Sequence, residues 1–161
     1  MMSINLKIGI LCRYLLLLMT FLGALNAILR YLSKFAGMAL NSNALVELQW
    51  YLFGSIFLLG AGYTLAKSKH VRVDILYGNI SKKYQRLIDI VGIFVFLLPF
   101  CVASIWLSWD FVLKSWEQWE ISSDAGGLPR YPIKTIIPVG FALLFFEGIR
   151  ELMRLFSLQG E

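Results

Sequence analysis

The chain has 161 residues, of which 58% are hydrophobic and only 16% are charged, with a formal net charge of +5 and a mean hydropathy of +0.70. Soluble domains carry roughly 25% charged residues, so this composition disfavours a soluble enzyme, a disordered chain and a disulfide-rich scaffold. The composition favours an integral membrane protein.

Four apolar runs have the character of membrane-spanning helices, which need about 20 residues to cross the hydrocarbon core. Three runs carry at most one charge each: residues 8–29, 48–66 and 90–109. The fourth run, 135–146, is shorter and reaches membrane length only if Glu147 and Arg150 lie near an interface. The alternating pattern of a β-barrel is missing. We therefore predict an all-α integral membrane protein with one four-helix domain over 1–161 and spans at about 8–30, 45–66, 87–113 and 133–154.

The first apolar run also resembles a cleaved signal peptide in two respects. Lys7 precedes the run and the small residue Ala27 lies near its end. However, the run is longer than the usual apolar region of a signal peptide, and Leu25 stands where a small residue is needed. A retained first helix is the favoured interpretation.

Lysine and arginine are unevenly shared between the two sides of the membrane that four spans define. The side with both termini has Lys7, Arg13, Lys67, Lys69, Arg72, Lys82, Lys83, Arg86, Arg150 and Arg154, and the other has Arg30, Lys34, Lys114, Arg130 and Lys134. The positive-inside rule then predicts that both termini are cytoplasmic. Membrane phospholipids with anionic headgroups explain the basic loops, so no nucleic-acid partner is expected.

All five tryptophans fall at or beyond the predicted outer ends of the second and third spans: Trp50, Trp106, Trp109, Trp116 and Trp119. An interfacial aromatic belt explains this distribution, and a contact surface for a partner is the alternative. The helical period of the third span continues to about Ser122, where glycines and prolines then stop it. We expect a periplasmic partner to contact this protruding segment through Trp109, Trp116, Trp119, Arg130 and Tyr131.

The segment between the second and third spans is cationic and amphipathic. In its first part, His70, Arg72 and Asp74 are expected to have a structural role as a lipid anchor and turn, with proton sensing by His70 as the alternative. Residues 75–86 are too polar to span and are predicted to form a short interfacial amphipathic segment before the third span. Ser81 is predicted to cap the helix of that span.

The sequence offers no catalytic, metal-binding or cofactor-binding residues. Cys12 and Cys101 are predicted at different membrane depths and are interpreted as buried, inert thiols. His70 is the only histidine, so no histidine-rich metal site is expected. Ion-coupled carriers usually keep an ionisable group near the bilayer centre, and none of the four runs supplies one. These absences favour a subunit over a complete transporter.

Several polar and small residues are candidates for fixing the helices. Arg30 and Glu47 are both predicted at the outer membrane end, where they would form an ion pair with Asn26 as an additional partner, or else snorkel separately to water. In the last span, Glu147–Arg150 and Glu151–Arg154 have the i,i+3 spacing that lets opposite charges meet. Close helix packing is expected at Gly54, Gly60 and Gly62.

In their order along the chain, several of these features resemble a known family. They are Asn26-x-x-x-Arg30, Glu47, His70-Val-Arg-Val-Asp74 and the Gly-Leu-Pro-x-x-Pro stretch at 127–132. Together they resemble the small membrane subunit, the Q or DctQ-like component, of tripartite ATP-independent periplasmic (TRAP) transporters. The resemblance implies a bacterial or archaeal inner-membrane protein that braces a large M subunit.

The same resemblance implies a periplasmic binding protein that docks on the complex and delivers an organic acid, driven by an ion gradient. It implies no catalytic residues, and the substrate sites belong to M. The alternative from another class is a small membrane-embedded enzyme or redox component that holds a cofactor between helices. That alternative would need histidines or paired cysteines at matched depths, which this sequence lacks.

Overall fold

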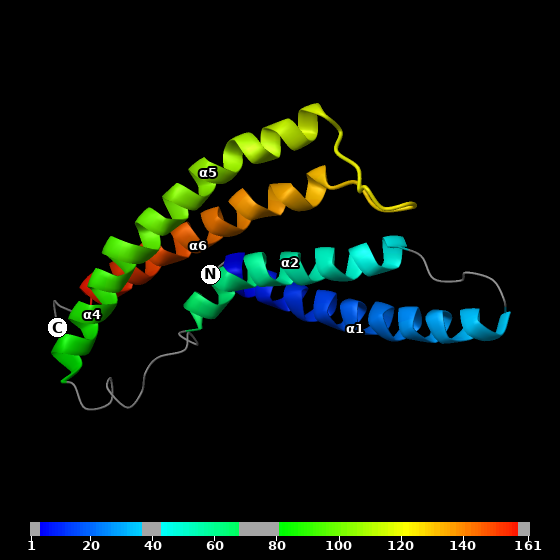
Figure 1. Ribbon diagram of the computed structural model, residues 1–161. Helices are drawn as coiled ribbons and strands as arrows, with labels where there is room; N and C mark the ends of the chain where they lie inside the picture. Colours follow the sequence, from blue (N-terminus) through cyan, green and yellow to red (C-terminus); the bar gives the residue numbers. More distant parts are fainter. Residues whose placement is uncertain (1–3, 37–42, 68–80, 158–161) are drawn as a thin grey trace.

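The computed structural model describes residues 4–36, 43–67 and 81–157. Its elements are α1 (Ile4–Ala36), α2 (Asn43–Ala66), α4 (Lys82–Val91), the π-helix η1 (Gly92–Leu97), α5 (Leu98–Glu117) and α6 (Tyr131–Ser157) (Figure 1). Helices α4, η1 and α5 follow one another without a break from Lys82 to Glu117. With α1, α2 and α6 this rod makes four helices that are long and apolar enough to cross a membrane. The predicted all-α, four-span fold is confirmed.

Each observed helix extends beyond the apolar run that predicted it, because helical hydrogen bonding can continue into the polar layer at the membrane surface. The third helix, however, ends earlier than predicted. It stops at Glu117, whereas the helical period suggested about Ser122.

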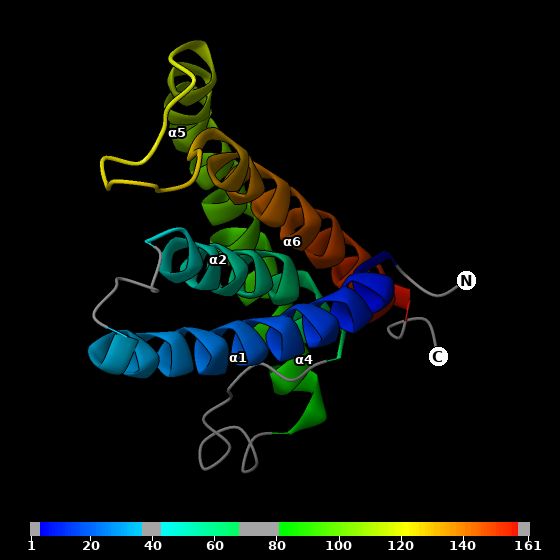
Figure 2. The ribbon, with the colours of Figure 1, turned by 90° about the vertical axis from the view of Figure 1, so that its right-hand side faces the viewer.

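The helices lie side by side in a row and do not form a closed bundle. Helix α2 packs on α1 and on α6, and α6 packs in turn on α5. Figures 1 and 2 show the resulting order α1, α2, α6, α5. One end of the row, the loop end, holds the last turns of α1 and α5 and the first turns of α2 and α6. The other, terminal end holds the first turns of α1 and α4 and the last turns of α2 and α6.

Helix α6 has two neighbours in the row and contains more buried residues than α2 or α5. From Gly140 onwards its buried positions recur with each helical turn, and the full set is Pro138, Gly140, Leu144, Glu147, Gly148, Glu151, Leu152 and Leu155. Two of them are glycines in close contact with a neighbouring helix. A Cβ on Gly140 would lie 2.9 Å from the backbone oxygen of Leu58 in α2, and one on Gly148 would lie 2.9 Å from Leu97 Cδ2 in η1. These glycines allow α6 to approach both neighbours.

The glycines predicted to pack helices behave in three different ways. Gly62 contacts α1, since a Cβ there would lie 2.7 Å from Asn5 Oδ1. A Cβ on Gly60 would lie 3.9 Å from Cys12 Sγ, an ordinary contact. The close packing predicted at Gly54 is wrong, because a Cβ there would meet nothing within 4 Å in the described residues.

The predicted amphipathic segment, 75–86, lies partly outside the described residues. Ser81 does occupy the N-cap of α4, but its hydroxyl makes no capping hydrogen bond. Its carbonyl oxygen instead accepts from the Gln85 N–H at 3.1 Å. The expected position of the cap is confirmed, and the expected side-chain role is wrong.

Candidate partner interface at the loop end

Helix α5 ends in a Schellman turn whose left-handed residue is a tryptophan. The N–H of Glu120 donates to the Ser115 carbonyl at 3.0 Å, and the N–H of Trp119 donates to the Trp116 carbonyl at 3.2 Å. Trp119 has a φ of 46°, a conformation in which glycine is usual and a bulky side chain is strained. This turn reverses the chain and ends the helix before Ser122.

Three aromatic rings pack together beside this turn. The ring centroids of Trp116 and Tyr131 are 4.5 Å apart, those of Trp119 and Tyr131 5.3 Å, and those of Trp116 and Trp119 6.2 Å. The indole N–H of Trp116 also donates to Thr135 Oγ1 at 2.8 Å. Contacts between aromatic rings stabilise such clusters, so these rings offset the strain at Trp119 and join the end of α5 to the start of α6.

The 118–130 loop then folds back on itself and is held against α2 by Glu47. The Ser122 N–H donates to the Leu128 carbonyl at 3.1 Å. Glu47 accepts from the Leu128 N–H through Oε2 at 2.5 Å and from the Ser122 hydroxyl through Oε1. Glu47 is only 3% exposed. A buried carboxylate with two donors is well satisfied, and here the donors come from the loop.

Two further side chains of α2 bind the same loop. Asn43 donates its side-chain N–H to the Ala125 carbonyl at 3.0 Å, and the Tyr51 hydroxyl is 3.3 Å from the Pro129 carbonyl oxygen. Gly127 lies close to the Glu47 carboxylate, and a Cβ at this position would be only 2.9 Å from Glu47 Oε2. A larger residue would therefore crowd the anchor. Asn43, Glu47 and Tyr51 lie on one face of α2 at i, i+4 and i+8, which makes that face the anchor of the loop.

Glu120 and Lys134 connect the two ends of the loop. They form an ion pair, Ser115 donates to Glu120 at 2.7 Å, and the Arg130 N–H donates to the Glu120 carbonyl at 2.8 Å. The hydrogen bonds from Lys134 and Ser115 lower the pKa of the Glu120 carboxyl below its ordinary value. The loop is therefore a fixed surface with anchors on α2, α5 and α6.

The structure places the predicted partner-contact residues on or beside this surface. Trp116, Trp119 and Tyr131 form the aromatic cluster, and both tryptophans are exposed. Arg130 lies in the loop next to Ser122, 3.4 Å from its hydroxyl. Trp109 is exposed on α5, two turns before the cluster.

The predicted ion pair between Arg30 and Glu47 is wrong. Ion pairs of the described residues include Lys134–Glu120, Arg150–Glu147 and Arg154–Glu151, and none of these three joins Arg30 to Glu47. Glu47 is bound by the loop, and Arg30 is exposed on α1. Asn26 does not supply a further contact either, because its Oδ1 is buried without a hydrogen-bond partner.

A second polar cluster lies at the terminal end. The predicted pairs Glu147–Arg150 and Glu151–Arg154 are both confirmed. Glu147 also accepts a hydrogen bond at 2.7 Å from the side-chain N–H of Asn5, and both of these side chains are buried. This contact ties the start of α1 to α6, and no sequence pattern had pointed to Asn5.

The remaining site predictions concern the 70–74 segment, the two cysteines and the possibility of a metal site. His70, Arg72 and Asp74 lie outside the described residues. Cys12 and Cys101 are both free and buried. Within the described ranges, no group of three or more His, Cys, Asp or Glu side chains is arranged to hold a metal ion.

Comparison with known proteins identifies the kind of chain to which these features belong. Residues 19–158 match the family described as tripartite ATP-independent periplasmic transporters, DctQ component. The chain belongs to this family. This DctQ-family chain is also 30% identical over 118 residues to the C4-dicarboxylate TRAP transporter small permease protein DctQ of Pseudomonas aeruginosa.

That alignment covers 71% of this chain and 53% of the relative, so the DctQ-family chain spans about half the length of the curated relative that it matches. The family match confirms the resemblance seen in the sequence. The chain is a multi-pass membrane protein of the DctQ family.

Proposed function

We propose that this chain braces the large M subunit of a TRAP transporter and offers the 118–130 loop as a docking surface for a periplasmic binding protein. The observation that carries the proposal is the open row of helices in a member of the DctQ family. The complex takes up an organic acid with the energy of an ion gradient. The C4-dicarboxylate named for the Pseudomonas aeruginosa relative is one member of that substrate class.

The exposed apolar surface of the row supports a large membrane partner. Stable helical domains bury the apolar stripe of each helix against a second layer, whereas a single row leaves broad faces uncovered. Helices η1 and α5 form one edge of the row, here called the α5 flank, and on it Phe96 of η1 is 70% exposed. Trp106 and Leu107 of α5 are 76% and 72% exposed. Lipid can cover such side chains, but a packed protein layer would also rigidify the row.

The properties of the 118–130 loop support the docking role. The loop is anchored by Glu47 and closed by the Glu120–Lys134 ion pair, so it needs little ordering on association, which lowers the entropic cost of binding. Trp116 and Trp119 expose aromatic surface beside it, and tryptophan is enriched at protein interfaces.

The proposed orientation places the termini in the cytoplasm and the loop end in the periplasm. Basic residues support it, because the terminal end has Lys7, Lys67, Lys82, Lys83, Arg86, Arg150 and Arg154 within the described ranges. The chain is proposed to be non-catalytic, and its localisation to be the bacterial or archaeal inner membrane.

Transport by proteoliposomes tests the proposal. Liposomes that contain the M subunit, supplied with the binding protein, should lose most organic-acid uptake when this chain is omitted. This chain alone should move no substrate. Uptake by this chain reconstituted by itself, or full uptake by M without it, would overturn the bracing role.

Site-directed cross-linking then tests the contact surface. Single cysteines at Phe96, Trp106 and Leu107 probe the α5 flank, and cysteines at Leu17 and Phe21 probe exposed positions of α1. The natural thiols Cys12 and Cys101 are buried, so they give little background. Cross-links to M should concentrate on one face of the row, and an even distribution over all these positions would contradict a defined interface.

A further inference from the structure

Helix α4 has an exposed apolar stripe that begins outside the membrane core. Tyr84, Leu87, Ile88 and Val91 are exposed at i, i+3, i+4 and i+7, the spacing of one helix face. Phe94 and Val95 of η1 continue this stripe and are also exposed. The rod from Lys82 to Glu117 has 36 residues, about 54 Å at the rise of an α-helix, and therefore exceeds a hydrocarbon core of about 30 Å. Its first turns reach the headgroup layer.

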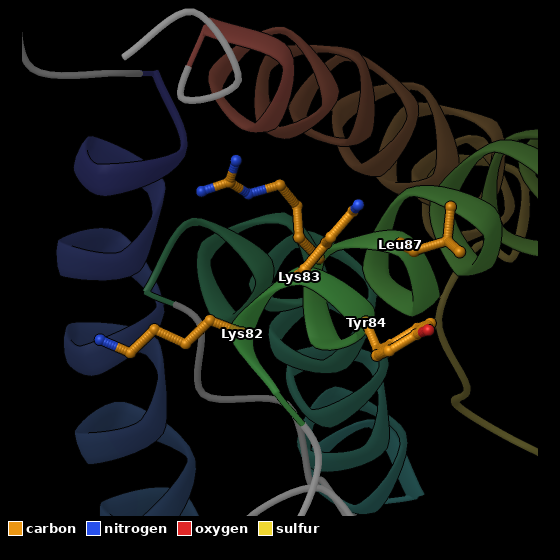
Figure 3. Close-up of a pocket in the computed structure, with 5 residues that line it drawn as sticks. Lys82, Lys83, Tyr84 and Leu87 are labelled. Atoms are coloured by element: carbon orange, nitrogen blue, oxygen red, sulfur yellow. The ribbon is translucent and has the colours of Figure 1, made fainter.

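A cationic pocket lies at the start of this stripe. It has a volume of about 400 Å³ and is lined by Lys82, Lys83, Tyr84, Arg86 and Leu87. In Figure 3 the side chain of Lys82 extends from the helix on the side away from Tyr84 and Leu87. The lining of the pocket therefore includes the charged groups of two lysines and an arginine, a phenol and an apolar side chain.

The two lysines of this pocket differ from those cations of the described residues that pair with a carboxylate. Arg150, Arg154 and Lys134 each pair with a carboxylate. Lys82 and Lys83 are exposed, and neither has an ion-pair partner within the described ranges. Lysines that remain unpaired in the headgroup layer attract anionic lipid.

We propose that this pocket binds the headgroup of an anionic phospholipid. Lys82 and Lys83 contact the phosphate, Tyr84 lies at the level of the glycerol backbone, and an acyl chain follows the stripe from Leu87 past Val91 to Phe94. The combination of cations with an apolar path favours a lipid over a free phosphate ion, which would gain nothing from the stripe. This site does not depend on M or on the binding protein.

Native mass spectrometry of the full-length protein in detergent tests the site. Phosphatidylglycerol and phosphatidylcholine with identical acyl chains are titrated separately, and inorganic phosphate is added as a competitor. The unmodified protein should retain phosphatidylglycerol in preference. The double variant Lys82→Gln/Lys83→Gln should bind it about fivefold more weakly for each lysine removed, which is about 25-fold in all, with unchanged binding of phosphatidylcholine.

The matched control is Lys7→Gln/Lys67→Gln, which removes the same charge from exposed lysines at the terminal end that do not line the pocket. It should keep the preference. Equal binding of both lipids by the unmodified protein, an undiminished preference in the Lys82/Lys83 variant, or an equal loss in the control would overturn the proposal. Displacement of the lipid by millimolar phosphate would overturn it in favour of a free-anion site.

A charge-preserving variant separates binding from folding. Lys82→Arg/Lys83→Arg should keep most of the preference, since the site needs cations near the phosphate. If the arginine variant melted at the same temperature as the unmodified protein but had lost its preference for phosphatidylglycerol, the electrostatic basis of the site would be contradicted.

Discussion

The carboxylate of Glu47 in α2 accepts a hydrogen bond from the backbone N–H of Leu128, 81 residues further along the chain, at 2.5 Å. The same carboxylate binds the Ser122 hydroxyl. One acidic side chain in the first turns of α2 therefore fixes the loop that joins α5 to α6. The position of the proposed docking surface depends on this side chain.

Substitution of Glu47 should release the 118–130 loop. Glu47→Ala leaves the Leu128 N–H without its acceptor, which costs about 1–3 kcal/mol for a buried donor. Glu47→Gln keeps one acceptor oxygen and should have a smaller effect. Hydrogen–deuterium exchange of the peptide that contains Leu128 should accelerate in the order unmodified protein, Gln variant, Ala variant.

Glu117 provides the control for this experiment, because it is an exposed carboxylate at the same end of the row. Glu117→Gln should leave the exchange of the loop unchanged. If Glu47→Ala exchanged no faster than this control, Glu47 would not be the anchor of the loop.

The sequence predicted features that depend on neighbours along the chain and missed those that depend on distant ones. The spans follow from apolar runs, and the pairs Glu147–Arg150 and Glu151–Arg154 follow from helical spacing. Arg30 was expected to need a partner near the lipid, and Glu47 was the predicted one because it enters the second span at the membrane end where Arg30 leaves the first. The actual partners of Glu47 are a serine and a backbone N–H in a distant loop, and a backbone N–H leaves no signature in a sequence.

The row of helices was not predictable for a similar reason. Apolar periodicity shows that a helix has a buried face, but it does not show which helix covers that face. The close contacts of Gly140 with Leu58 and of Gly148 with Leu97 decide which helices adjoin α6. The sequence instead predicted close packing at the glycines of α2, but a Cβ added to Gly54 would meet no atom of the described residues within 4 Å.

The left-handed backbone of Trp119 can be tested by comparing two variants. Both Trp119→Gly and Trp119→Ala remove the indole and its contacts with Trp116 and Tyr131. Only alanine retains the strain of a positive φ, which costs roughly 1–2 kcal/mol. The glycine variant should therefore be more stable than the alanine variant by about 1 kcal/mol in denaturant or thermal unfolding in detergent. Equal stabilities would show that the turn relaxes when the indole is removed.

The lowered pKa of Glu120 predicts a dependence of stability on pH. Because the folded pKa lies below the unfolded value of about 4.3, the ionised carboxylate stabilises the fold above that value, and this contribution is lost as pH falls through the folded pKa. Glu120→Gln should melt at a lower temperature than the unmodified protein at pH 7, and the difference should shrink as the pH is lowered towards 3. Glu117→Gln, which removes an exposed carboxylate from the same end of the row, is the control measured at the same pH values. A difference that stays constant with pH would assign the effect of Glu120 to neutral hydrogen bonds.

The contact between Gly62 and Asn5 predicts that two glycines of one helix respond in opposite ways to the same substitution. In Gly62→Ala the new Cβ would lie 2.7 Å from Asn5 Oδ1. Asn5 cannot simply turn away, because its side-chain N–H is held by Glu147. We expect a loss of about 1–3 kcal/mol, the usual cost of overpacking. Gly54→Ala meets open space and should be neutral or stabilising by up to about 1 kcal/mol, since alanine favours a helix over glycine.

A double-mutant cycle identifies Asn5 as the cause. In an Asn5→Ala background the obstacle is gone, so Gly62→Ala should cost at least about 1 kcal/mol less than it does in the unmodified protein, as expected for residues in direct contact. Gly54→Ala should have the same effect in both backgrounds. Additive effects of Asn5→Ala and Gly62→Ala would show that α1 and α2 can separate slightly without cost, and the polar cluster of Asn5 and Glu147 would then not fix the spacing of these helices.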